Sequence, residues 1–389
     1  MKLQTISQNE IKNKKVLLRL DLNLPIGVAI DNTRLLLHLE TIELLKKNHN
    51  QIIIISHFGR PTSDDPYFSL EFIAEKIATL CKCEVAFISS TKFDEIAATI
   101  DQTSKSAIIL LENTRFFEGE TNNDHWLAKE WAGLADVFVN DAFSVCHRSH
   151  ASVVGIPAYL PSFAGLQIER ELLALEKFIS NPAKPSIAIV GGSKISSKFE
   201  LLESLAVKFD KLFIGGAMAH SLLLTQGTDI GRSLYEPDYL EESEVLLTKH
   251  QHKILLPIDF AVLDINSQKA IKDTDTIEHD DKILDIGPAT IAMLRKEIAI
   301  AKSLVWNGPL GLYEDPRFAH GTAQIADFIA DQTLQQHLTS VIGGGDIVSA
   351  IRNIADSNIN DFSYISPSGG AFLEWLEDKE LPGIRVLTK

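Results

Sequence analysis

The chain has 389 residues, 45% of them hydrophobic, which is enough for two domains that each bury a core. Its formal net charge of -15 argues against a general affinity for nucleic acid or acidic membranes, so an anionic ligand would need locally concentrated cations. The chain has only three cysteines, which argues against a disulfide framework and a zinc site. No apolar run reaches membrane-spanning length, and the opening residues do not resemble a signal peptide, so we expect a cytoplasmic protein.

In the first half of the chain, apolar strands alternate with helical segments. The expected strands are 16–20, 52–56, 107–111 and 137–139. This alternation predicts a parallel α/β sheet with right-handed crossovers. Ligands of such sheets bind outside the carboxyl ends of the strands, so the residues that follow each strand are the candidate site.

Polar and cationic residues follow these strands directly. They are Asp21 and Asn23, then His57, Phe58, Gly59 and Arg60, then Arg115, and finally His147, Arg148 and His150, with Arg34 opening the helical segment after the first strand. One such arginine is usually only a surface residue, but four arginines after four successive strands favour an anion site. Each could donate two parallel hydrogen bonds to a phosphate or carboxylate, and a hydrogen bond to a charged group contributes about 1.5–3 kcal/mol.

Residues 165–181 are the expected connection between two domains. An amphipathic stripe runs from Ile168 through Leu172 and Leu175 to Ile179. Pro182 and Pro185 follow, and a residue before proline avoids the helical conformation. We therefore predict a first domain over 1–170, a hinge helix end and linker over 171–185, and a second domain over 186–375.

Glycine-rich turns follow the strands of the second half. The expected strands are 187–190, 211–214, 254–256, 304–306 and 341–342. Gly191-Gly192 ends the first of them, and Lys194 and Lys198 follow four residues apart on one helix face. Glycines let a backbone approach a ligand, and a helix start offers free N–H donors, so this turn suits a phosphate.

The remaining turns of the second half suggest a nucleotide. Glu314 could accept hydrogen bonds from ribose hydroxyls, and Asp346 lies where a helix should begin. Magnesium usually takes one or two carboxylates together with phosphate oxygens, so Asp346 is the candidate ligand for Mg²⁺. As isolated motifs, such glycine turns are weak indicators.

Short motifs along nearly the whole chain resemble those of the phosphoglycerate kinase family, in the family's order. They are RLDLNLP (19–25), DNTR (31–34), SHFGRP (56–61), ENTRF (112–116), DAFSVCHRSHAS (141–152), VGGSKISSK (190–198), GGAMA (215–219), DIGP (285–288), WNGPLGLYE (306–314) and GGGD (343–346). The chain departs from the family at Ile347, where Thr or Ser is usual, and at 366–371, which reads SPSGGA instead of an STGGGA-like turn.

The resemblance implies two doubly wound, Rossmann-like parallel-sheet domains joined by a hinge helix, with the segment 376–389 returning to the first domain. It implies reversible phosphoryl transfer between 1,3-bisphosphoglycerate and ADP, giving 3-phosphoglycerate and ATP, with Mg²⁺ and in a monomer. The implied substrate-binding residues are Asp21, Asn23, Arg34, His57, Phe58, Gly59, Arg60, Arg115 and Arg148. The implied nucleotide-binding residues are Lys194, Lys198, Gly215, Glu314, Gly344, Gly345, Asp346 and Ile347, with Arg34 and Lys194 catalytic and Asp346 at the metal.

Two other classes of protein remain open from the residues alone. A two-domain dinucleotide oxidoreductase shares this architecture, but the chain lacks a GxGxxG fingerprint and repeats its arginines at one edge. A catalytically weak relative that acts as a nucleotide-binding protein would keep most of these motifs.

Overall fold

The computed structural model describes residues 2–23, 33–366 and 368–389, so Leu24, Pro25, Asp31 and Asn32 of the first two motifs lie outside the described residues. The chain forms two compact units, Met1–Leu173 with Glu380–Lys389, and Ala174–Lys379. The last residues pair with the first: Lys2 N donates to Lys389 O at 3.0 Å, and Lys389 N donates to Lys2 O at 3.1 Å.

The first unit contains a six-stranded sheet in the order β3-β4-β2-β1-β5-β6, with parallel pairing throughout. The strands are β1 Lys15–Arg19, β2 Gln51–Ile55, β3 Val85–Ile88, β4 Ile108–Leu111, β5 Val137–Asn140 and β6 Ser162–Ala164. This confirms the parallel α/β class that was predicted. The short strands β3 and β6 at the two sheet edges were not predicted.

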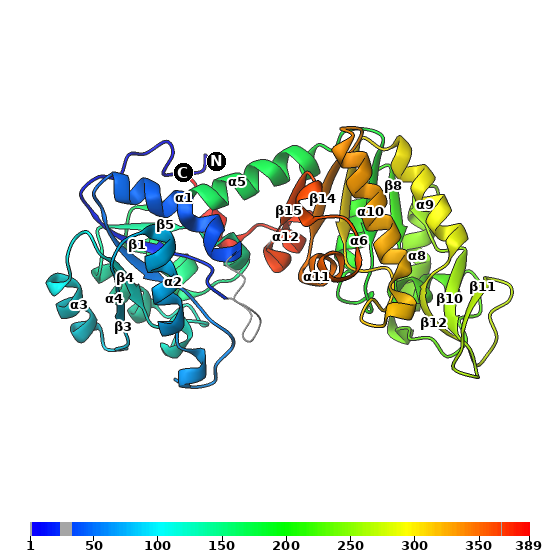
Figure 1. The fold of residues 1–389 in the computed structure, drawn as a ribbon, viewed down its shortest axis with the longest axis horizontal. Coiled ribbons are helices and arrows are strands. Elements are labelled where there is room, and N and C mark those ends of the chain that lie inside the picture. The colour runs from blue at the N-terminus through cyan, green and yellow to red at the C-terminus, as the bar shows by residue number, and fades with distance from the viewer. Residues whose placement is uncertain (1, 24–32, 367) are drawn as a thin grey trace. The chain divides into compact units, whose positions relative to one another are not determined.

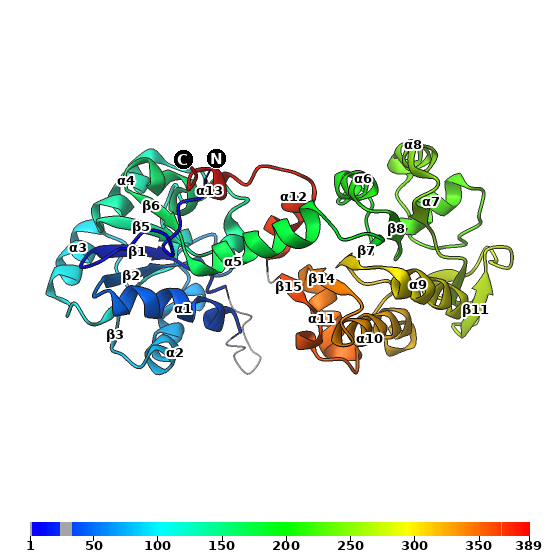
Figure 2. The same cartoon turned by 90° about the horizontal axis from the view of Figure 1, so that it is seen from above.

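Helices cover both faces of this sheet. Along a strand, successive side chains point to opposite faces, so Val16 and Leu18 pack in one core while Leu17 packs in the other. The first core includes residues of α1 (Thr33–Lys47) and α2 (Glu71–Cys81), and the second includes residues of α3 (Phe93–Gln102) and α4 (His125–Gly133). Figure 2 shows α1 and α2 on one side of the strands and α4 on the other. The unit is therefore doubly wound.

The second unit contains a second six-stranded parallel sheet, in the order β15-β14-β13-β7-β8-β9. Its strands are β7 Ser186–Val190, β8 Lys211–Ile214, β9 Ile254–Leu255, β13 Ser303–Asn307, β14 Thr339–Gly343 and β15 Tyr364–Ser366. Its helices are α6 Phe199–Lys208, α7 Met218–Thr225, α8 Leu240–His250, α9 Pro288–Ile300, α10 His320–Leu334, α11 Gly345–Ile354 and α12 Gly369–Leu376 (Figure 1). The chain leaves the neighbouring strands β7 and β13 toward α6 and α10, which places a ligand-binding crevice at their carboxyl ends.

A three-stranded antiparallel sheet in this unit was not predicted. It pairs β10 (Asp259–Leu263) with β11 (Lys269–Asp273) and β12 (Lys282–Ile286). Strand β11 alternates exposed and half-buried residues and carries three charges, so it lacks the apolar run that marks the buried parallel strands.

Helix α5 (Leu166–Leu175) continues into a π-helical segment, Glu176–Ser180, close to the predicted 165–181. The division between the two units falls inside α5. A short helix, α13 (Pro382–Arg385), lies in the returning C-terminal segment.

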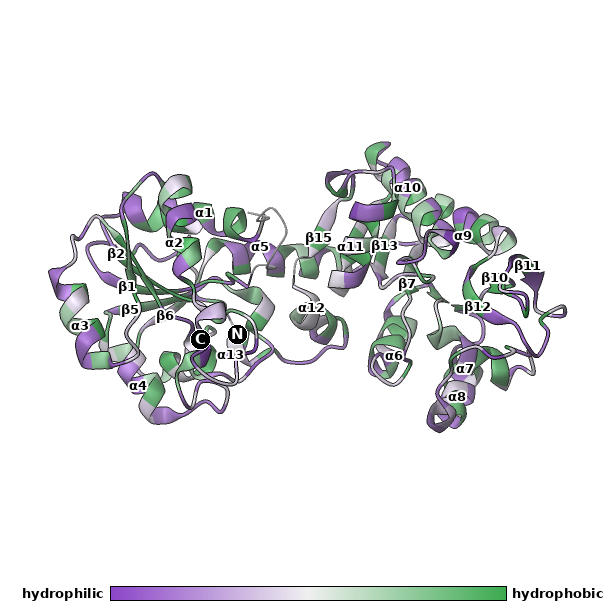
Figure 3. Ribbon diagram, turned by 60° about the horizontal axis from the view of Figure 1, so that its bottom comes forward, coloured by the Kyte–Doolittle hydropathy of each residue, from purple (hydrophilic) through white to green (hydrophobic). Residues whose placement is uncertain are grey.

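Figure 3 shows the strands of the first unit as mainly hydrophobic and its helices as mixed, which fits buried sheets under amphipathic helices. Among the described residues, no helix is both long and apolar enough to span a membrane.

Candidate active site

The first unit forms a cavity of about 670 Å³ beyond the carboxyl ends of its strands, lined by both cationic and acidic side chains. Arg60, Arg115, Arg148 and His150 line it, and these residues come from the loops after β2, β4 and β5. The structure therefore brings together three of the predicted substrate arginines. Within the described part of the chain, none of the three arginines forms an ion pair with a carboxylate.

The cationic groups of this cavity repel one another. Burial and the neighbouring Arg148, Arg19 and Arg60 lower the pKa of Arg115 to about 10. Burial and Arg60 likewise lower the pKa of Arg148. A multivalent anion would relieve both the repulsion and the missing pairing, so the cavity is suited to a phosphate group.

Asp21 and Asn23 connect the loop after β1 to its neighbours. Asp21 Oδ2 accepts hydrogen bonds from Arg34 Nη1 at 2.5 Å and from Ser144 Oγ at 2.6 Å. Asn23 Oδ1 accepts from Gly59 N at 2.9 Å. Burial opposes ionisation of Asp21, but Arg34 and the hydrogen bond from Ser144 to its carboxylate outweigh burial and hold the pKa of Asp21 at about 2. Arg34, predicted at the reacting group, is thus paired with an ionised carboxylate in the described state.

Phe58, predicted to bind substrate, is buried in the core. Its ring packs against Phe72 at a centroid distance of 5.2 Å, and Asn113 bonds both its backbone N–H and its carbonyl oxygen. Gly59, with φ +60°, accepts a hydrogen bond at its carbonyl oxygen from Nη1 of Arg115, which lines the cavity. The Phe58 side chain therefore packs in the core, and a role of this residue in substrate binding stays a prediction.

Arg19 was overlooked in the sequence, where it reads as part of a strand. It is fully buried, and its Nη2 lies 3.1 Å from Nδ1 of His57. A guanidinium group can only donate, so Nδ1 of His57 accepts and the proton of a neutral imidazole resides on Nε2. Burial and Arg19 lower the pKa of His57 well below its ordinary value, which keeps the ring neutral. Among the described contacts the Nε2–H of His57 has no acceptor, so it is a candidate donor to a ligand.

A buried carboxylate holds Arg19 in place through a serine. Arg19 Nε donates to Ser152 Oγ at 3.0 Å, and Ser152 donates to Glu120 from Oγ at 2.6 Å and from its backbone N at 3.0 Å. The charged residue inside the apolar run VLLRL was the only sequence signal for this network.

In the second unit, Lys198 lies at the turn after β7. Its Nζ donates to the carbonyl oxygen of Gly191 and to Asn307 Oδ1, each at 2.7 Å. Burial lowers its pKa to about 8, with Asp346 opposing the shift. Lys194 is exposed and forms no ion pair among the residues described. The two predicted lysines thus occupy different environments.

A second cavity, of about 410 Å³, lies beside this turn. Its walls are partly apolar, from Leu284, Pro309 and Leu312, and Glu314 and Asp346 add carboxylates. The glycine of the β8 turn at this cavity is Gly216; a Cβ on the predicted Gly215 would instead meet Phe213 at 2.8 Å and Leu310 at 3.0 Å, as a packing position does.

Gly344, Gly345, Asp346 and Ile347 form the start of α11. Gly344 has φ +115° and precedes the first N–H groups of the helix, which have no intrahelical acceptor. The Ile347 side chain is fully buried in the core of the unit, so only its backbone is available to a ligand. No cluster of three or more potential metal-ligating side chains occurs among the described residues, and Asp346 is an exposed carboxylate beside the cavity, as is Glu314.

Comparisons with known proteins identify the family of this chain. The model of the family described as phosphoglycerate kinase matches residues 6–379. A phosphoglycerate kinase of Wolbachia pipientis subsp. Culex pipiens is 43% identical over 98% of both chains, and that of Azorhizobium caulinodans is 40% identical over 99% of both. The phosphoglycerate kinase structure from Coxiella burnetii has a TM-score of 0.87 at 35% identity and covers 99% of this chain and 98% of its own. The structure of the enzyme from Pyrococcus horikoshii has a TM-score of 0.83 at 29% identity over 99% and 98%.

The fold and these relatives together define a phosphotransferase whose acceptor is a carboxyl group. The chain belongs to the phosphoglycerate kinase family.

Proposed function

We propose that the chain transfers a phosphoryl group reversibly between 1,3-bisphosphoglycerate and ADP, giving 3-phosphoglycerate and ATP, with Mg²⁺. The observation that carries the substrate assignment is the cavity of Arg60, Arg115 and Arg148, which have no carboxylate partners among the residues described. These groups would bind the 3-phosphate, because guanidinium groups match phosphate oxygens in charge and geometry.

The chemistry requires no general base. In the ATP-consuming direction, a carboxylate oxygen of 3-phosphoglycerate attacks the γ-phosphorus and forms an O–P bond, which gives the acyl phosphate. The bond between the γ-phosphorus and the β,γ-bridging oxygen breaks, and ADP leaves with that oxygen. A carboxylate is already ionised at neutral pH, so the protein must only position the reactants and neutralise charge. Arg34 and Lys194 would stabilise the transferring group, Asp21 and Asn23 would orient the glycerate, and the Nε2–H of His57 would donate to it.

The second cavity would hold the nucleotide. Its apolar walls would enclose the base, Glu314 would accept hydrogen bonds from the ribose, and Lys198 with the backbone of 344–347 would bind the phosphates. Asp346 would hold Mg²⁺, which neutralises phosphate charge when bound. One exposed carboxylate ligand is enough for this ion, since magnesium takes its other ligands from phosphate and water.

Replacing Arg148 with alanine should weaken binding of 3-phosphoglycerate by about 10- to 100-fold, because a charge-assisted hydrogen bond contributes about 1.5–3 kcal/mol. Affinity for ADP should stay within about twofold of the native value. Titration calorimetry with each ligand alone measures both. Arg170→Ala, which removes an exposed arginine outside the cavity, is the matched control. Equal losses for both ligands would contradict the assignment of the two cavities.

Nucleotide binding should depend on pH through Lys198. Its pKa of about 8 in the free protein means that half of the ammonium groups lose their proton near that pH, whereas bound phosphates favour the charged form. Affinity for ADP should therefore be constant below pH 7 and fall by up to about tenfold per pH unit above pH 8. Calorimetry in buffers of different ionisation enthalpy should detect proton uptake on binding. Lys198→Arg, which stays charged, should abolish this dependence; a native protein with no uptake would contradict it.

A further inference from the structure

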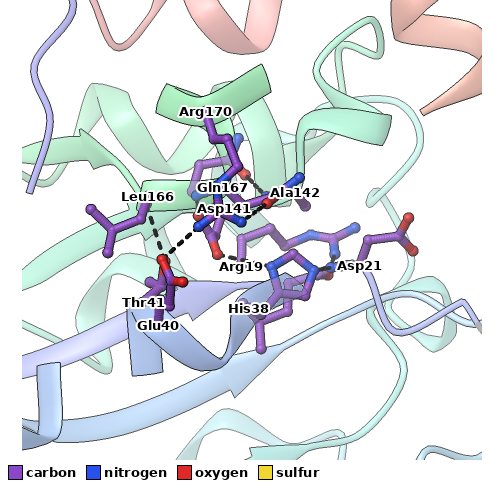
Figure 4. A network of polar contacts seen from close by, with 12 residues as sticks. Arg19, Asp21, His38, Glu40, Thr41, Asp141, Ala142, Leu166, Gln167 and Arg170 are labelled. Atoms are coloured by element: carbon purple, nitrogen blue, oxygen red, sulfur yellow. Dashed lines mark hydrogen bonds and ion pairs between the residues drawn. The ribbon is translucent and has the colours of Figure 1, made fainter. Parts of the chain in front are cut away.

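A continuous chain of buried contacts joins Asp21 to the first turn of helix α5 (Figure 4). The backbone N–H of Asp21 donates to Nε2 of His38 at 3.3 Å, and Nδ1 of His38 lies 2.8 Å from Asp141 Oδ2. The other carboxylate oxygen of Asp141 accepts from the backbone N–H of Gln167 at 2.8 Å. Every link lies within the first unit, although α5 itself continues into the second.

The protons in this chain are assigned by its partners. A backbone N–H can only donate, so Nε2 of His38 must accept, and a neutral imidazole then has its proton on Nδ1 and donates to Asp141. The exposed fractions of the two side chains are 3% and 0%, so water does not compete for these hydrogen bonds. His38 is the only side chain that bonds both Asp21 and Asp141 among the described contacts.

Helix α1 provides side chains that bond Asp21 and a side chain that bonds the start of α5. Arg34 and His38 lie one turn apart on α1, and they bond the carboxylate and the backbone of Asp21, respectively. Thr41, a further turn along, accepts from the N–H of Leu166 through its Oγ1 at 3.0 Å. Thr41 and Asp141 thus accept from the backbone N–H groups of Leu166 and Gln167, two of the groups that a helix start leaves without an intrahelical acceptor.

We propose that His38 is a positioning residue for the substrate site, which fixes Asp21 and, through Asp141, couples its position to the first turn of α5. The inference rests on the proposed function, in which Asp21 orients the glycerate. A ligand that draws Asp21 into one position also orders His38 and Asp141, and α5 becomes better capped. Substrate in the first unit thus tightens the start of the helix that runs into the second.

The test compares three variants of the full chain. His38→Leu removes both hydrogen bonds at similar volume, and His38→Gln restores one acceptor and one donor. Glu40→Gln is the matched control, because Glu40 also links α1 to α5, through Arg170 at 2.5 Å, but at an exposed position outside the chain of contacts. Steady-state kinetics give KM for each substrate, and hydrogen exchange of peptides covering 166–170 reports on the helix start with and without 3-phosphoglycerate.

His38→Leu should raise KM for 3-phosphoglycerate by about two- to tenfold, the range for one net hydrogen bond, and leave KM for ATP unchanged. In the native protein and in Glu40→Gln, 3-phosphoglycerate should slow hydrogen exchange at 166–170. This ligand-dependent slowing should be absent in His38→Leu. His38→Gln should recover part of the slowing. Should His38→Leu fail to fold, the same measurements on His38→Gln decide, with intermediate values expected.

Two outcomes would overturn the inference. Equal changes in both KM values would mean that His38 only stabilises the fold, and unchanged ligand-dependent exchange in His38→Leu would mean that Asp21 and α5 are not coupled. Failure of the proposed function is a separate result, because the native protein would then show neither turnover nor any effect of 3-phosphoglycerate on exchange.

Discussion

Replacing Arg34 with alanine should lower kcat by about 10²–10³-fold, the loss that follows removal of one donor to transition-state charge. In the described state Arg34 forms an ion pair with Asp21, and its side chain is 35% exposed. It can therefore turn to the transferring phosphoryl group without leaving an empty cavity behind in the core. An interaction made mainly in the transition state affects kcat more than KM.

Arg34→Lys separates charge from geometry and should recover only part of the rate, because an ammonium group cannot bridge two oxygens as guanidinium does. The folded state should be nearly unaffected, which thermal unfolding checks. An Arg34→Ala enzyme with native kcat and a raised KM for 3-phosphoglycerate would place Arg34 in ground-state binding instead.

Gly308→Ala should destabilise the second unit by about 2–5 kcal/mol, combining a left-handed backbone with an overpacked contact. Gly308 has φ +85°, and a Cβ there would collide with the carbonyl oxygen of Gly191 and lie 2.8 Å from Lys198 Nζ. Because Gly191 and Lys198 shape the proposed phosphate site, ADP binding should be lost as well. Urea unfolding and calorimetry measure the two effects.

Gly227→Ala is the matched control for backbone strain. Gly227 has φ +83°, but a Cβ there would meet no atom within 4 Å. The Gly227→Ala substitution should lower the free energy of unfolding by only about 1–2 kcal/mol and leave ADP binding intact. If the two variants were equally stable and both bound ADP, close packing of the β7 and β13 turns would have no role in the site.

The fold could be predicted wherever strands are buried on both faces. Strands such as Ile52–Ile55 read as continuous apolar runs and were located closely. Edge strands and the antiparallel sheet were missed because their residues are half-exposed and their pairing depends on distant partners, as in Ser162–Ala164 and Lys269–Asp273.

The candidate site was predictable where residue type alone indicates chemistry. Arg60, Arg115 and Arg148 follow strands and do meet at one cavity. The direction in which a side chain points, and whether it is buried, could not be predicted. Arg19 turns inward to orient His57, and the Ile347 side chain enters the core. Such directions depend on packing between elements far apart in the chain, which strand periodicity does not encode.

The most direct test is a coupled, NADH-linked assay of the native chain with 3-phosphoglycerate, ATP and Mg²⁺. We expect turnover that saturates in both substrates and requires a divalent cation, and Arg34→Ala should reduce this turnover by at least about 100-fold. ATP binding without any conversion of 3-phosphoglycerate, under conditions in which the protein is folded, would contradict the account and leave a nucleotide-binding protein without this activity.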